Sequence, residues 1–493
     1  MDTFEFTVAS YRTYRECPDQ YKDAYIRSAC AVKISETDDE VRVAVACSRM
    51  EDTGNYLISF HAPKKVVLVA VGDGDFAEFI GNIVDADAAL GGEAQGNATG
   101  AFELESISES APVVNIINAL CLEAVRRGAS DIHIQGEESS MRIRFRIDGV
   151  LQTVRTMDKS LFAGIASRIK IMASLNIMEQ RQPQDGRMQV SAEGVSLDFR
   201  VSFVPTAYGE SIVLRIFNAQ KHALSLDELG FSSDRHALLK KALSIPNGLI
   251  LATGPTGSGK TTTLHALLRG MDREALKIIT IEDPVERVLE HVDQIQVNES
   301  IGLTFDSMLR RVLRQDPDVI MVGEIRDSAT AELAVRAALT GHVILSTLHT
   351  NDSVSAVTRL KNMGIEPYLV SSVLKYALAQ RLVRKVCPHC AKTVPLTAEM
   401  KALQKKFGVA GTKMKAAVGC EQCSFTGYAG RTVVSEVFEI GEDVALLIDK
   451  EKSDAELRSR AAKNGMKMLA EDAVRKILAG VTTLEEAKRE ALV

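Results

Sequence analysis

The stretch Leu249–Thr261, which reads LILATGPTGSGKT, constrains the fold of this chain more than any other. Its apolar start, Leu249–Ala252, is typical of a buried parallel strand, and the residues after Thr261 look helical. Between them lies a Gly-rich loop that fits the pattern G-x-x-x-x-G-K-[ST]. The order of strand, Gly-rich loop and helix predicts a parallel α/β domain that binds a nucleotide.

The residue types in this loop are those that a nucleotide phosphate needs. Glycines let backbone N–H groups turn inward around a phosphate, and the helix N-terminus adds partial positive charge. Lys260 can reach the β- and γ-phosphates of ATP, and the Thr261 hydroxyl can ligate Mg²⁺. A Gly-rich turn that matches by chance is disfavoured, because a strand and a helix flank it. The predicted nucleotide-binding residues are Gly254, Pro255, Thr256, Gly257, Ser258, Gly259, Lys260, Thr261 and Thr262.

The composition restricts the class of protein further. The chain has 493 residues and a formal net charge of −6, which argues against a dedicated nucleic-acid binder. No apolar run approaches the ~20 residues that a membrane-spanning helix needs. The N-terminus lacks the basic start and apolar core of a signal peptide. We therefore expect a cytoplasmic protein that contacts a membrane only through a partner.

The chain divides into segments of different composition. Residues 90–105 are rich in Gly, Ala and polar residues, which is typical of a flexible linker. Met141–Ile147 alternates apolar residues with Arg, which predicts a strand with one buried and one basic face. The predicted segments are a small α/β domain over 1–89, a linker over 90–107, an α+β domain over 108–223, a linker over 224–235 and a P-loop domain over 236–493.

Three polar segments follow predicted strands downstream of the phosphate loop, where open α/β sheets bind ligands. Glu324 follows the apolar run Asp318–Val322 and fits an acid that holds Mg²⁺ through water or orients the attacking water. Glu282 competes for the role of general base, against the alternative of an acid in a turn before Pro284. His349 fits a hydrogen-bond donor to the γ-phosphate, against the alternative of an ordinary loop histidine.

Eight cysteines are present, and four of them form two C-x-x-C pairs. In a reducing compartment this spacing favours a tetrahedral zinc site over disulfides. The predicted ligands are Cys387, Cys390, Cys420 and Cys423. All four thiolates would bind the metal, so a structural site is expected, within a subdomain at about 386–430. The alternative is four buried or reduced thiols.

Taken together, these motifs resemble the secretion and pilus-assembly ATPases. In that family GPTGSGKT is the phosphate loop, TIEDPVE the aspartate box, DVIMVGEIRD the Walker B strand and STLHTN the histidine box. The resemblance extends upstream through ASDIHIQ and YGESIVLRI and downstream through LAQRLVRKVCPHC and GYAGRT, from about residue 112 to 435.

The resemblance implies a RecA-like ATPase domain, preceded by the α+β domain and carrying a zinc-binding insert. It implies a homohexamer in which ATP lies between the two domains. By position, Arg200 and Arg215 match arginines that reach the nucleotide phosphates, and Arg187 is a third candidate. The alternative is that these arginines are ordinary charges on the polar face of a sheet.

The implied function is ATP hydrolysis that drives pilin or pseudopilin assembly in a type II secretion system or a type IV pilus. Retraction ATPases of this family lack the tetracysteine insert, so the chain looks like the assembly type. Its N-terminal domain is expected to dock on inner-membrane platform proteins, a bitopic docking protein and a polytopic platform protein, at the cytoplasmic face. One rival is a DNA-uptake or other nucleic-acid motor, and another is a zinc-dependent binding module with a vestigial nucleotide site.

Overall fold

The computed structural model describes residues 30–37, 39–50, 64–72, 113–192, 195–217 and 224–493, together with isolated residues between 21 and 76. The chain forms two compact units, Met1–Ile107 and Ser108–Val493. The sequence pattern at 76–84 predicts an amphipathic helix. Nearly all of that stretch and the predicted linker at 90–107 lie outside the described residues. None of the described helices is long and apolar enough to cross a lipid bilayer.

The first unit contains a three-stranded sheet in the order β1-β2-β3. β1 pairs antiparallel with β2, and β2 pairs parallel with β3. Its strands are β1 (Ala31–Glu36), β2 (Glu40–Ala46) and β3 (Lys65–Val71), and a short turn of 3₁₀-helix, Cys47–Arg49, follows β2. The alternating stretch at 41–45 and the apolar run at 66–71 predict strands, and β2 and β3 confirm both predictions. β1 was not predicted from the sequence.

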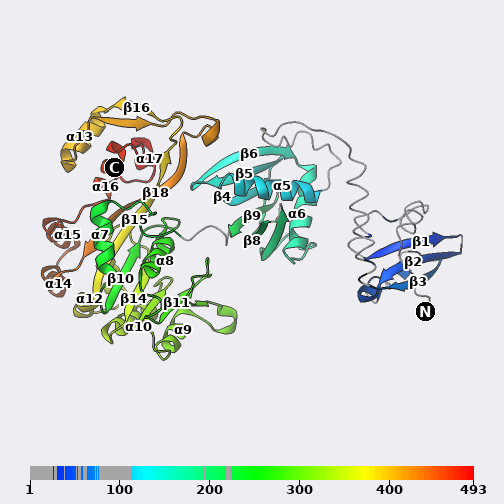
Figure 1. Ribbon diagram of the computed structural model, residues 1–493, viewed down its shortest axis with the longest axis horizontal. Coiled ribbons are helices and arrows are strands. Elements are labelled where there is room, and N and C mark those ends of the chain that lie inside the picture. The colour runs from blue at the N-terminus through cyan, green and yellow to red at the C-terminus, as the bar shows by residue number, and fades with distance from the viewer. Residues whose placement is uncertain are drawn as a thin grey trace. The chain divides into compact units, whose positions relative to one another are not determined.

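The second unit begins with an antiparallel six-stranded sheet in the order β6-β5-β4-β9-β8-β7. Helices α5 and α6 pack on one face of this sheet (Figure 1) and share a single core with it. The elements are α5 (Val113–Arg126), β4 (Ala129–Gly136), β5 (Ser140–Ile147), β6 (Val150–Asp158), α6 (Ser160–Met172), β7 (Gln184–Ala192), β8 (Val195–Thr206) and β9 (Gly209–Phe217).

The alternation expected along β5 is confirmed. Met141, Ile143 and Phe145 are fully buried against the helices, while the arginines between them stay partly exposed on the opposite face. Because successive side chains of a strand point to opposite faces, one face of the sheet is apolar and the other is rich in arginine.

The remainder of the second unit is built on a seven-stranded sheet in the order β12-β11-β13-β14-β10-β15-β18. Its strands pair in parallel, except that β18 is antiparallel to β15. The strands are β10 (Gly248–Thr253), β11 (Ile278–Glu282), β12 (Asp293–Gln296), β13 (Val319–Val322), β14 (Val343–Leu348), β15 (Leu374–Val386) and β18 (Tyr428–Glu439).

Helices cover both faces of this sheet (Figure 1). One face packs against α9 (Phe305–Val312), α10 (Ser328–Leu339), α11 (Ser355–Asn362), α12 (Pro367–Val373), α14 (Glu442–Asp449) and α15 (Asp454–Lys463). The other face packs against α7 (Ser233–Ala242) and α8 (Lys260–Gly270). α7 thus begins inside the stretch at 224–235 that was expected to be a linker.

β15 and β18 continue past the sheet into a C-terminal subdomain with its own core. That subdomain adds β16 (Lys392–Pro395), α13 (Ala398–Phe407), β17 (Lys413–Ala416), α16 (Leu469–Leu478) and α17 (Leu484–Arg489), with a 3₁₀-turn at Glu421–Cys423. The stretches at 453–456 and 483–486 both fit the sequence pattern of a capping box, and the structure confirms the one at Ser453. At Thr483 only the N-cap forms, because the Glu486 carboxylate is held by Arg384 and Arg489.

Candidate functional site

The phosphate loop follows β10 and leads into α8, as the sequence predicts. Gly254, Gly257 and Gly259 all have positive φ, with values of 142°, 78° and 88°. A Cβ on Gly254 would lie 2.6 Å from the carbonyl oxygen of Gln380 and 2.7 Å from Ser258 Oγ, so no larger residue fits there. The glycines therefore give this loop a shape that other residues rarely adopt.

Lys260 is the first residue of α8, and its side chain is largely buried. Its Nζ donates hydrogen bonds to the carbonyl oxygens of Gly254 at 2.8 Å and Pro255 at 3.1 Å. Burial lowers the pKa of Lys260, with the positive charge of Arg381 adding to that effect and Glu324 opposing it. The acid that acts on the Lys260 charge therefore follows the end of β13, and the arginine lies on β15.

Glu324 and His349 meet beyond the carboxyl ends of β13 and β14. His349 Nε2 lies 3.6 Å from Glu324 Oε2, and Arg326 forms an ion pair with the other carboxylate oxygen. Thr347 Oγ1 donates to the Gly323 carbonyl oxygen at 2.8 Å, which ties the two strand ends together. A Cβ on Gly323 would lie 3.1 Å from the Ile281 carbonyl oxygen, so a glycine provides the room expected beside Glu324.

Glu282 occupies a different environment at the end of β11. Its side chain is 2% exposed, and its carboxylate accepts from Thr280 Oγ1 at 2.6 Å and Gln294 Nε2 at 2.9 Å. The Nε2 atom of His265, on α8, lies 3.0 Å from its other oxygen. Burial raises the pKa of Glu282, but these hydrogen bonds outweigh that effect and lower it. The carboxylate is thus engaged by protein groups on both oxygens.

The three candidate arginines lie directly opposite one another on the polar face of the six-stranded sheet. Arg187 pairs in register with Arg200, and Arg200 pairs with Arg215. Arg215 lies opposite Asp131, and its Nε donates to Asp131 Oδ1 at 2.9 Å. Across residues 113–192, 195–217 and 224–493, the side chains of Arg187 and Arg200 form no hydrogen bond or ion pair. Like charges placed directly opposite are destabilising, which favours a face that receives an anion.

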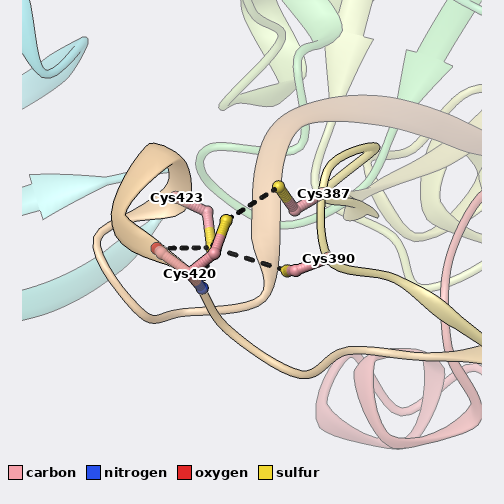
Figure 2. A group of neighbouring side chains, drawn as sticks. All are labelled: Cys387, Cys390, Cys420 and Cys423. Atoms are coloured by element: carbon pink, nitrogen blue, oxygen red, sulfur yellow. Dashed lines mark hydrogen bonds between the residues drawn. The ribbon is translucent and has the colours of Figure 1, made fainter.

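The four cysteines of the C-x-x-C pairs converge on one point (Figure 2). Cys387 Sγ and Cys420 Sγ are 3.9 Å apart, as are Cys390 Sγ and Cys423 Sγ, and the Cys420 and Cys423 sulfurs are 3.8 Å apart. Tetrahedral zinc with bonds of about 2.3 Å requires sulfurs about 3.8 Å apart. The donor set and its spacing therefore fit a structural zinc ion.

Backbone amides surround these sulfurs. Gly419 N donates to Cys390 Sγ at 3.3 Å, and Cys420 N and Gly427 N each donate to Cys423 Sγ at 3.2 Å. Burial raises the pKa of Cys423, but the two amides, together with the thiols of Cys420 and Cys390, outweigh it and lower the pKa to about 6. Amides that stabilise a thiolate are what a metal ligand requires.

Sequence reasoning missed two residues of β15 that lie beside the phosphate loop. Gln380 is 1% exposed, and its Nε2 donates to the Ser258 carbonyl oxygen at 2.7 Å. Arg381 donates to the Asn351 carbonyl oxygen, beyond His349. The stretch LAQRLVRKV carries part of the family resemblance, but no spacing in it marks which residue faces the nucleotide site.

The fold and this site define a class, a P-loop ATPase with a RecA-like α/β domain, a preceding α+β domain and a tetracysteine subdomain. A family model described as Type II/IV secretion system protein matches residues 106–489. The chain therefore belongs to the Type II/IV secretion system protein family. The predicted fold class, the ATP hydrolase activity and the expected place among the type II secretion and type IV pilus ATPases are thereby confirmed.

The similar proteins include components of type II secretion systems and of type IV pilus systems. The chain is 47% identical to the type II secretion system protein HxcR of Pseudomonas aeruginosa, over 78% of this chain and 79% of that protein. It is 45% identical to the type IV pilus assembly ATPase PilB of Myxococcus xanthus, over 78% and 69%. The crystal structure of the pilus retraction motor PilT with bound ADP superposes with a TM-score of 0.52 at 26% identity, covering 76% of this chain and 96% of PilT.

Proposed function

We propose that this protein forms a hexameric ring that converts ATP hydrolysis into the assembly of pilin-like subunits into a filament. The observation that carries the proposal is one continuous match, residues 106–489, which contains both the phosphate loop and the tetracysteine cluster. The filament is a type II secretion pseudopilus or a type IV pilus, since relatives from both machines are similar to the same extent.

In the proposed mechanism the phosphate loop and Lys260 bind the β- and γ-phosphates of ATP. Mg²⁺ would be held by the Thr261 hydroxyl and, through water, by Glu324, and it would neutralise charge on the phosphates. Glu324 orients the attacking water, because its carboxylate faces Lys260 and His349. His349 donates a hydrogen bond to the γ-phosphate.

The arginine row of the α+β domain completes the proposed site. A guanidinium can hold two phosphate oxygens at once, and an arginine supplied at the transition state contributes ~10³–10⁵ in rate. Arg200 and Arg215 lie on neighbouring strands, so their spacing is fixed by the sheet. We propose that ATP draws this domain against the phosphate loop and that hydrolysis releases it, which is the motion that the motor transmits.

We also propose a structural role for zinc and a recruitment role for the N-terminal unit. Zinc on the four cysteines fixes the C-terminal subdomain. The N-terminal unit recruits the ring to inner-membrane platform proteins, a bitopic docking protein and a polytopic one, so that the ATPase works peripherally at the cytoplasmic face. No direct contact with lipid is part of the proposal, and nucleic acid is not a substrate.

Replacement of the chromosomal gene by a Lys260→Ala variant tests the proposed function in the organism of origin. Loss of secreted proteins from the medium, or of surface pili, with normal amounts of the variant protein is the expected result. The ATPase rate of the purified protein is measured in parallel with and without DNA. Normal secretion and piliation in the variant, or strong stimulation by DNA, would favour a nucleic-acid motor instead.

A further inference from the structure

Arg381 lies where β15 passes the phosphate loop. β15 pairs in parallel with β10, and the last pair in register is Thr253 with Ala379. The two residues that follow Ala379 therefore run alongside the first residue of the loop, Gly254. A Cβ on Gly254 would lie 3.3 Å from Arg381 Nη1, which places the guanidinium directly against the loop.

The guanidinium of Arg381 donates to two main-chain oxygens, one on its own strand and one on a separate loop. Its Nη1 donates to the Gln380 carbonyl oxygen at 3.2 Å, and its Nη2 donates to the Asn351 carbonyl oxygen at 3.3 Å. Asn351 lies two residues beyond His349. One planar side chain thus links β15, which runs beside the phosphate loop, to the loop that carries the histidine. We call this segment, residues 349–353, the histidine loop.

The far end of the histidine loop is held independently. Ser353 N and Ser353 Oγ each donate to Glu436 Oε1 at 2.8 Å, and Glu436 is buried on β18 opposite Ala379. Among the described residues, Arg381 links the middle of the histidine loop to β15, the strand beside the phosphate loop. The link is made at Asn351, two residues from His349. His349 itself is 52% exposed, and besides its loop the side-chain partner that faces it is Glu324, at 3.6 Å.

The charge of Arg381 argues against a role in packing alone. The side chain is half-buried, and within the described part of the chain it forms no ion pair with a carboxylate. Burial lowers the pKa of this arginine, and the more distant carboxylates of Glu490, Glu436 and Asp352 offset that effect only in part. An uncharged side chain would fill the space at a lower cost, whereas a positive charge beside the phosphate loop favours a bound polyphosphate.

We propose that Arg381 is a positioning residue for ATP hydrolysis, which couples the phosphate loop to the histidine loop and so holds His349 against the γ-phosphate. The inference rests on the role proposed above for His349. A lysine in its place would keep the charge but could not form the same planar fork, so it could not bridge both carbonyl oxygens.

Four variants test this inference in the assembled enzyme: Arg381→Ala, Arg381→Lys, His349→Ala, and the double variant with Arg381→Ala and His349→Ala. Loss of positioning is expected to lower kcat about 10-fold or more, since a displacement of about 1 Å can cost 10²-fold, while KM for ATP changes less than about 3-fold. Arg381→Lys should recover little of the rate. Lys385→Ala, on the same strand and exposed, is the matched control and should turn over normally.

The double-variant cycle separates positioning from a general structural effect. If Arg381 acts through the histidine loop, the double variant should be about as slow as His349→Ala alone. Multiplied single effects, or a normal kcat in both Arg381 variants, would overturn the inference. A normal kcat in His349→Ala would instead overturn the role of the histidine, so the two failures are distinguishable. Thermal unfolding shows whether each variant is folded. If Arg381→Ala does not fold, the kcat of the more conservative Arg381→Lys variant tests the inference instead.

Discussion

At the scale of single residues, the two acids near the phosphate loop differ in what surrounds them. The sequence placed Glu282 and Glu324 at strand ends but could not separate their roles, since both follow an apolar strand. The difference arises from partners distant in sequence: Gln294 and His265 engage Glu282, while Glu324 stays 21% exposed beside His349. No local pattern encodes such contacts.

We therefore expect Glu324→Gln to lower ATP turnover about 10²–10³-fold with nucleotide binding retained, because an acid facing the reacting phosphate is lost. Glu282→Gln should reduce turnover less and should lower the unfolding temperature, because a buried hydrogen-bonded carboxylate is replaced. Turnover, ATP affinity and thermal unfolding of both variants are the measurements. The reverse ranking of the two turnover rates would make Glu282 the base.

At the scale of elements, the parallel strands of the ATPase domain were predictable because they are short apolar runs that end in polar loops. The C-terminal strand pair was not, since Leu374–Val386 and Tyr428–Glu439 mix charged and apolar residues. Both strands belong to the central sheet and to the C-terminal subdomain. Their polar side chains contact residues on several helices, so the strands do not show a simple apolar pattern. Glu486 on α17, which accepts from Arg384 on β15, is one such contact.

The pH dependence of stability tests this anchoring of α17. Burial raises the pKa of Glu486, but hydrogen bonds from Arg489 and Arg384 outweigh it and lower the pKa from 4.5 to about 2. The stabilisation is therefore complete above pH 4.5 and is lost as the pH falls towards 2. Glu486→Gln should cost roughly 2 kcal/mol of unfolding free energy at pH 7 and flatten the loss of stability in acid. Glu485→Gln, exposed on the same helix, should change neither.

The tetracysteine cluster is the element whose site the sequence predicted most directly, because metal-ligand spacing is local within each C-x-x-C pair. We expect one zinc ion per chain by elemental analysis of the purified protein. Cys420→Ser should release it and lower the unfolding temperature, since structural zinc contributes roughly 10–16 kcal/mol in small zinc-finger peptides. The exposed Cys47→Ser serves as control. A folded, active protein with far less than one zinc would contradict the assignment.

At the scale of the whole molecule, we propose that the division into two units separates recruitment from chemistry. The proposed catalytic residues all lie in Ser108–Val493, whereas the first unit carries no proposed site residue. A truncation that starts at Ser108 is expected to keep ATP turnover per chain within about 3-fold of the full chain at matched assembly, and to lose membrane association in cells. Fractionation of cell membranes checks this, and a truncated chain that stays on the membrane unaided would refute the recruitment role.

The sequence alone could not place the arginine row in relation to Lys260, because the two lie in different domains joined by residues 218–235. The pairing of Arg187 with Arg200 and of Arg200 with Arg215 across β7, β8 and β9 follows from the strand pairing in the sheet. We further propose that the α+β domain and its arginines reach the nucleotide only when neighbouring chains pack in the ring, so that an isolated chain has an incomplete site.

The measurement that tests this central claim most directly is ATP turnover per chain as a function of protein concentration, with the oligomeric state recorded at each point. We predict that turnover per chain rises as the ring assembles. Arg215→Lys should stay slow throughout, with a milder effect on ATP affinity, because lysine cannot form the bidentate contact. Arg142→Lys, in the same sheet and paired with Glu137, is the control. A turnover per chain that stays constant while the ring dissociates, with a near-normal rate in Arg215→Lys, would show that each nucleotide site works alone.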